Sequence, residues 1–68
     1  MNEFETNLLS QVDQSRQHLE VASRAGHEYE AHLHGARIRD LLEMAARHGV
    51  DTSDWVDPAL LDAVALGN

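Results

Sequence analysis

Histidine is the residue type in this chain with the clearest chemical potential. Imidazole nitrogens bind zinc, and the ring titrates near neutral pH. If the chain forms a helical hairpin that turns near residue 25, His18 lies beside His32, with Glu28 one helical turn before His32. His18, His32 and Glu28 are therefore the candidate metal ligands. The five histidines of the 68-residue chain are His18, His27, His32, His34 and His48.

We favour a simpler interpretation of these residues, in which they are solvated histidines that flank the hairpin and pair with nearby glutamates. The Glu-x-x-His pairs of di-iron bundles and the His-Glu-x-x-His sequence of zinc proteases do not occur. The sequence therefore predicts no metal and no cofactor. A proton-responsive role stays open, because protonating both His18 and His32 would disfavour the hairpin there.

Other catalytic chemistry finds no support in the sequence, so we expect a protein that is not an enzyme. There is no cysteine, which excludes disulfides, thiolate metal sites and cysteine nucleophiles. The serines lack a glycine-rich elbow, and no phosphate-binding loop occurs. Each of the four glycines fits a turn, a cap or close helix packing.

The charge balance narrows the class of partner. Twelve acidic residues against five arginines give a net charge of −7. The last 18 residues hold four aspartates and no base, which disfavours contact with nucleic acid. No run of 18 apolar residues predicts a membrane helix, and the polar N-terminal residues are unlike a signal peptide. We expect a cytoplasmic protein that binds neither nucleic acid nor membrane.

Periodic apolar residues predict an all-α fold. In residues 3–25, apolar or small side chains recur every three or four positions, and the same holds for residues 27–48. Gly26 separates the two segments, and Gly49 follows the second. The first set is Phe4, Leu8, Val12, Ser15, Leu19 and Ala22. The second set is Ala31, Gly35, Ile38, Leu42 and Ala45.

The two sets match if the helices pack as an antiparallel hairpin. Facing residues then have numbers that sum to about 50. Leu8 faces Leu42, Val12 faces Ile38, and Ser15 faces Gly35, so small residues meet where the helices approach. The competing structure is one continuous helix of about 46 residues, which would carry Gly26 at a cost of only about 1 kcal/mol.

A short third helix is predicted over residues 58–66, after a turn over residues 49–57. Asp57 and Pro58 are a favourable N-cap and first helical residue. A helix of about nine residues is not stable alone, so it must dock, with Trp55 as its anchor. The sequence does not decide whether it docks on its own hairpin or on another chain.

A second apolar set on residues 27–48 indicates a partner. Tyr29, Leu33, Ala36 and Met44 lie opposite Ile38 on a helical wheel, where a two-helix hairpin cannot cover them. A homodimer that forms a helical bundle is the favoured solution. A monomeric three-helix bundle with a few surface leucines is the alternative.

These features predict a small, single-domain, self-associating interaction module over residues 1–68, acting as a regulatory adaptor or accessory protein. A first alternative is an acidic inhibitor or antitoxin-like protein that caps a basic surface. A second is a histidine-based helical protein that responds to metal or pH. The predicted contact residues are Tyr29, Leu33, Met44, Trp55, Leu60, Leu61 and Val64.

Overall fold

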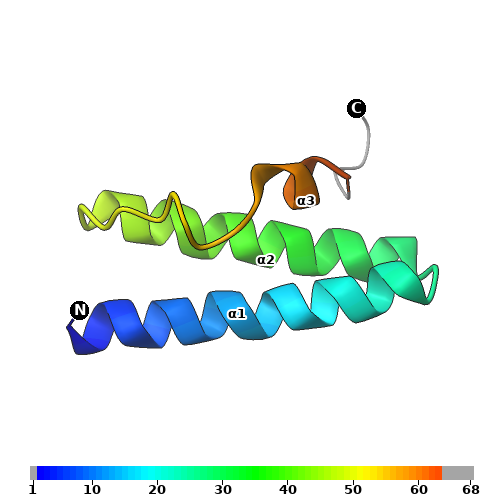
Figure 1. Ribbon diagram of the computed structural model, residues 1–68, viewed down its shortest axis with the longest axis horizontal. Coiled ribbons are helices and arrows are strands. Elements are labelled where there is room, and N and C mark those ends of the chain that lie inside the picture. Colours follow the sequence, from blue (N-terminus) through cyan, green and yellow to red (C-terminus); the bar gives the residue numbers. More distant parts are fainter. Residues whose placement is uncertain (1, 64–68) are drawn as a thin grey trace.

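Three helices make up the described structure, a computed structural model that describes residues 2–63. They are α1 (Glu3–Arg24), α2 (Glu28–Arg47) and α3 (Pro58–Ala63). The long helices α1 and α2 lie side by side and antiparallel, and the segment after α2 turns back along it to α3 (Figure 1). The all-α prediction of two packed long helices and a short third one is confirmed.

Gly26 forms the turn between α1 and α2. Its φ of 75° is left-handed, a conformation that glycine adopts without steric cost. The His27 amide donates to the Ala22 carbonyl at 2.9 Å, and the Gly26 amide donates to that of Ser23 at 3.2 Å. These bonds satisfy carbonyls at the end of α1 in a Schellman-type turn. A continuous helix through Gly26 is therefore wrong.

The helix starts follow the capping expectations in part. The Asn2 side chain accepts a hydrogen bond from the Glu5 amide at 2.8 Å, as an N-cap should. The Asp57 carboxylate accepts one from the Ala59 amide at 3.0 Å and caps α3. By contrast, His27 precedes α2 without a side-chain cap. The predicted third helix continued to residue 66, and its last three residues lie outside the described part.

Cross-helix contacts give the register of the hairpin. The rings of Phe4 and His48 lie 4.8 Å apart between centroids, and Arg37 donates to the Gln11 side chain at 3.3 Å. The numbers in each pair sum to within two of the predicted value of about 50. Val12 and Ile38 are buried, as the predicted pairing requires. The buried apolar core comprises Leu8, Val12, Leu19, Ala22, Ala31, Ile38, Leu41, Ala45 and Leu61.

The C-terminal segment completes this core within one chain. Leu61 is buried, and Trp55 and Leu60 pack against the core. The Arg39 guanidinium donates to the Leu61 carbonyl at 3.0 Å, which ties α3 to α2. Trp55, Leu60 and Leu61 thus pack on their own hairpin, and their predicted contact with a partner stays a prediction. Val64 lies outside the described residues.

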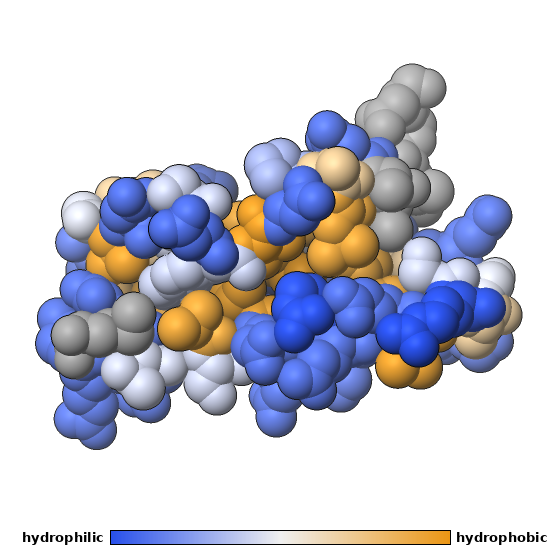
Figure 2. All heavy atoms as spheres, in the orientation of Figure 1, coloured by the Kyte–Doolittle hydropathy of each residue, from blue (hydrophilic) through white to orange (hydrophobic). Residues whose placement is uncertain are grey.

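Some apolar side chains next to the C-terminal segment are visible at the molecular surface. In Figure 2, the largest group of apolar atoms lies in the middle of the face shown, between the C-terminal segment and α1, and smaller apolar spots lie among polar residues towards both ends. Trp55, Val56 and Leu60 are only partly buried there.

Candidate functional site

The exposed apolar residues of α2 are the first candidate site. Tyr29 is 69% exposed, Leu33 47% and Met44 38%. Leu33 and Met44 are 11 residues apart, about three helical turns, so they share one face and lie about 16 Å apart along the axis. This face points away from the Ile38 side that fills the core. The structure thus leaves Tyr29, Leu33 and Met44 of the predicted apolar set exposed within one chain, whereas Ala36 is partly buried.

Leu33 and Met44 belong to a longer pattern, which we call the outer stripe of α2. All six of its residues are exposed, and they recur at alternating spacings of three and four. Four are charged, two of each sign, so the stripe is neutral although the chain carries −7. The outer stripe consists of Glu30, Leu33, Arg37, Asp40, Met44 and Arg47.

The outer face of α1 offers a comparison on the same molecule. Exposed residues recur there at the same spacings, but Val21 is the one apolar member, 63% exposed. The remaining members include a single charge, on Arg24. Such a face is well solvated and gives a partner helix little to bury. The six residues are Asn7, Ser10, Gln14, Gln17, Val21 and Arg24.

A shallow depression at the turn end of the hairpin is the second candidate site. It encloses about 300 Å³ and is open to solvent on one side. The rings of His18 and His34 meet in it, with centroids 5.3 Å apart and planes inclined by 51°. His27 Nδ1 lies 3.2 Å from the Glu30 carboxylate. The lining residues are His18, Val21, Ala22, Ala25, His27, Glu30 and His34.

The structure does not assemble the predicted metal ligands His18, His32 and Glu28. His18 pairs with His34 instead, and residues 32 and 34 lie about 200° apart around the helix. The predicted sum gives the height along the hairpin, and His34 is the histidine at that height on the side of His18. Within residues 2–63, no group of three or more histidine, cysteine, aspartate or glutamate side chains is arranged to hold a metal ion.

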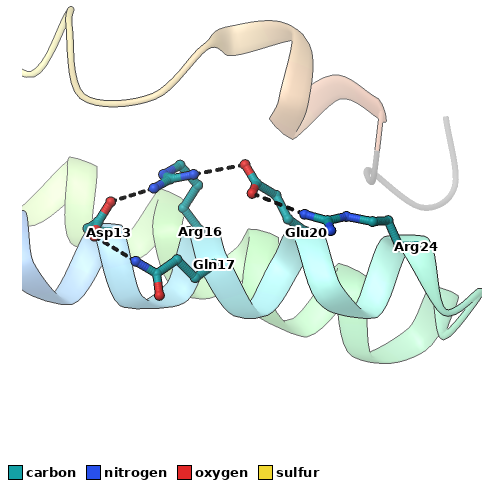
Figure 3. Close-up of polar contacts among 5 residues, drawn as sticks. All are labelled: Asp13, Arg16, Gln17, Glu20 and Arg24. Atoms are coloured by element: carbon teal, nitrogen blue, oxygen red, sulfur yellow. Dashed lines mark hydrogen bonds and ion pairs between the residues drawn. The ribbon is translucent and has the colours of Figure 1, made fainter.

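The charged residues on one side of α1 form an ionic ladder. Arg16 donates to Asp13 at 2.6 Å and to Glu20 at 2.8 Å, and Glu20 also lies 3.8 Å from Arg24 (Figure 3). Hydrogen bonds to the two carboxylates raise the pKa of Arg16. The Arg16 and Glu20 side chains extend from α1 on the side of the C-terminal segment. These charges satisfy one another, so the ladder does not present a free ionic site.

Two aspartates of the acidic C-terminal segment have local structural roles. The Asp51 carboxylate accepts a hydrogen bond from the Ser53 amide at 3.0 Å. That bond, together with one from the Ser53 side chain, lowers the pKa of Asp51. Asp57 caps α3 as described above. Because these carboxylates stabilise turns, the acidity of the segment does not by itself indicate a basic partner.

Comparisons with known proteins supply no family. No protein-family model, curated protein or solved structure matches this chain. None of the helices in residues 2–63 is long and apolar enough to cross a membrane. The two candidate sites are therefore the features of this chain from which a function can be inferred.

Proposed function

We propose that this protein is a non-enzymatic interaction module that self-associates through the outer stripe of α2. The observation that carries this proposal is the exposure of Leu33 and Met44 on one face of a helix whose opposite face is fully packed. Exposed apolar side chains at helical spacing favour pairing with another helix. A second copy supplies such a helix, and two hairpins then form a four-helix bundle.

This dimer is expected to dissociate on dilution. The stripe offers two apolar residues per copy, with Tyr29 beside its first residue, which is a small apolar contribution. Association must also offset the lost translational and rotational freedom of one copy. A regulatory adaptor or accessory protein in the cytoplasm, the compartment that the sequence favours, fits such reversible pairing.

Light scattering on the full chain over a wide concentration range tests this proposal. The mass should rise from 7.6 kDa for the single chain towards twice that value as concentration increases. A mass that stays at the single-chain value at every concentration contradicts self-association. The acidic-inhibitor alternative would then gain support if a basic protein partner were bound in a salt-sensitive way.

The paired rings of His18 and His34 favour a second candidate function, a response to metal or protons. Two imidazoles from different helices lie close together there, and a tetrahedral zinc ion would need two further ligands from solvent or from another molecule. Calorimetric titration with zinc chloride should detect binding that His34→Ala abolishes and His32→Ala preserves. Equal heats for both variants would contradict a site at this pair.

A further inference from the structure

We propose that the outer stripe of α2 binds the same stripe of a second copy in antiparallel orientation, across a two-fold axis. In this arrangement Leu33 packs against Met44 of the second copy, and Arg37 pairs with Asp40 of the second copy. This inference rests on the proposed self-association and specifies its orientation and register. It assigns the four charged residues of the stripe a role in the contact, in addition to that of the apolar residues.

The spacing of the stripe fits helix pairing. Alternating steps of three and four residues place all six side chains on one seam, as at the a and d positions of a coiled coil. In this numbering Glu30, Arg37 and Met44 take one type of position, and Leu33, Asp40 and Arg47 the other. Antiparallel helices bring each type against the other across the seam. The stripe extends from Glu30 to Arg47, a separation of 17 residues and about 26 Å along the helix.

Charge then selects one register. When Leu33 lies opposite Met44 of the second copy, Arg37 lies opposite Asp40 and Glu30 lies opposite Arg47. Every charged residue of the stripe therefore faces the opposite sign, twice over because of the two-fold axis. Opposite charges across helices stabilise pairing, and like charges oppose it.

The competing arrangements place like charges together. A parallel pair sets each charged residue against its own copy, for example Arg37 against Arg37. Sliding the antiparallel pair by seven residues sets Glu30 against Asp40 in one direction and Arg37 against Arg47 in the other. All of these arrangements lose the attractive charge pairs and the contact between Leu33 and Met44. They also place like charges opposite each other, which opposes association.

The rest of the molecule permits this contact. The stripe is neutral, so the charge of −7 is not concentrated at the interface. Trp55, Leu60 and Leu61 already pack on their own hairpin, so the C-terminal segment keeps its place. The present partners of two seam residues, Gln11 for Arg37 and His27 for Glu30, are exposed side chains that can be exchanged.

Two single variants of complementary charge test the register. Arg37→Asp gives a chain with aspartate at both central positions, and Asp40→Arg gives one with arginine at both. Each variant alone should dimerise about 10- to 100-fold more weakly than the wild type, because two attractive pairs become repulsive. An equimolar mixture should recover the wild-type dissociation constant as a heterodimer. Both chains stay net negative, since each substitution changes the charge of −7 by two, so overall attraction does not explain recovery.

Analytical ultracentrifugation gives the dissociation constants, and circular dichroism at low concentration checks the fold of each variant. Asp54→Arg, an exposed change of the same size in the loop before α3, is the matched control and should leave dimerisation unchanged. If a single variant unfolds, the double variant Arg37→Asp/Asp40→Arg replaces it and should dimerise like the wild type. A wild type that dimerises while the mixture and the double variant do not overturns the register. A wild type that stays monomeric overturns the proposed function itself.

Discussion

Replacing Leu33 by glutamate isolates the apolar part of the proposed contact. Full burial of a leucine side chain contributes about 1.5–3 kcal/mol. Leu33 is 47% exposed in one chain, so a partner covers about half of it. The two-fold contact removes two such contributions, about 2 kcal/mol in all, before any cost of burying the carboxylate. We therefore expect the dissociation constant to rise by about 30-fold or more.

Analytical ultracentrifugation of Leu33→Glu measures this change directly. The fold should be unaffected at low concentration, because Leu33 is exposed in the single chain and glutamate is a good helix former. Val21→Glu is the matched control, since it makes the same chemical change at an exposed apolar residue on the outer face of α1. If both variants dimerise like the wild type, or if both weaken dimerisation equally, the outer stripe is not the contact surface.

Three further predictions test the hairpin and its C-terminal segment. Gly35→Leu should overpack the buried position that faces Ser15 in the predicted register and lower stability by about 1–3 kcal/mol; thermal melting that matches the wild type would contradict close packing there. Leu61→Ala should lower stability by about 2–4 kcal/mol, because Leu61 is buried in the core; an unchanged unfolding midpoint in urea would show that α3 does not dock. Ser53 lowers the pKa of Asp51 from its ordinary value of 3.8, so the Asp51 carboxylate stabilises the turn above that pH and this contribution is lost as pH falls through the lower folded value. NMR titration of the Asp51 carboxyl should show a midpoint below 3.8, and Ser53→Ala should move it upward; a wild-type midpoint at or above 3.8 would refute the hydrogen bond.

The hairpin could be predicted from the sequence because several signals agree. Apolar residues at helical spacing specify two faces, and Gly26 supplies the left-handed residue that the turn needs. The register followed from matching the two faces, and the Phe4–His48 contact agrees with it to within two residues. Local and long-range preferences point to the same structure here.

The position of the C-terminal segment could not be predicted in the same way. A short amphipathic helix with an adjacent Trp55 can bury its apolar side on its own chain or on another, and its composition is the same in both cases. The contacts of Leu61 with the hairpin core decide in favour of its own chain. Trp55, Leu60 and Leu61 therefore pack within their own chain. The predicted interaction residues that the structure leaves exposed, Tyr29, Leu33 and Met44, all lie on α2.

The histidine pair and the charged part of the outer stripe were missed for different reasons. His34 rather than His32 meets His18 because the sum of about 50 places residues along the hairpin but not around the helix, and positions 32 and 34 lie about 200° apart around it. No role was predicted for Arg37 and Asp40, since charge alone does not distinguish a contact surface from a solvated one. Their alternating three- and four-residue spacing with Leu33 and Met44 was the signal in the sequence that could have revealed them.

Chemical shifts of backbone amides, followed by NMR as the full chain is diluted, test the central claim most directly. Self-association through α2 predicts concentration-dependent shifts that concentrate at and around Glu30, Leu33, Arg37, Asp40, Met44 and Arg47. The outer face of α1, around Gln14 and Val21, should show none. Shifts that do not change with concentration, or that concentrate on α1, would contradict the account.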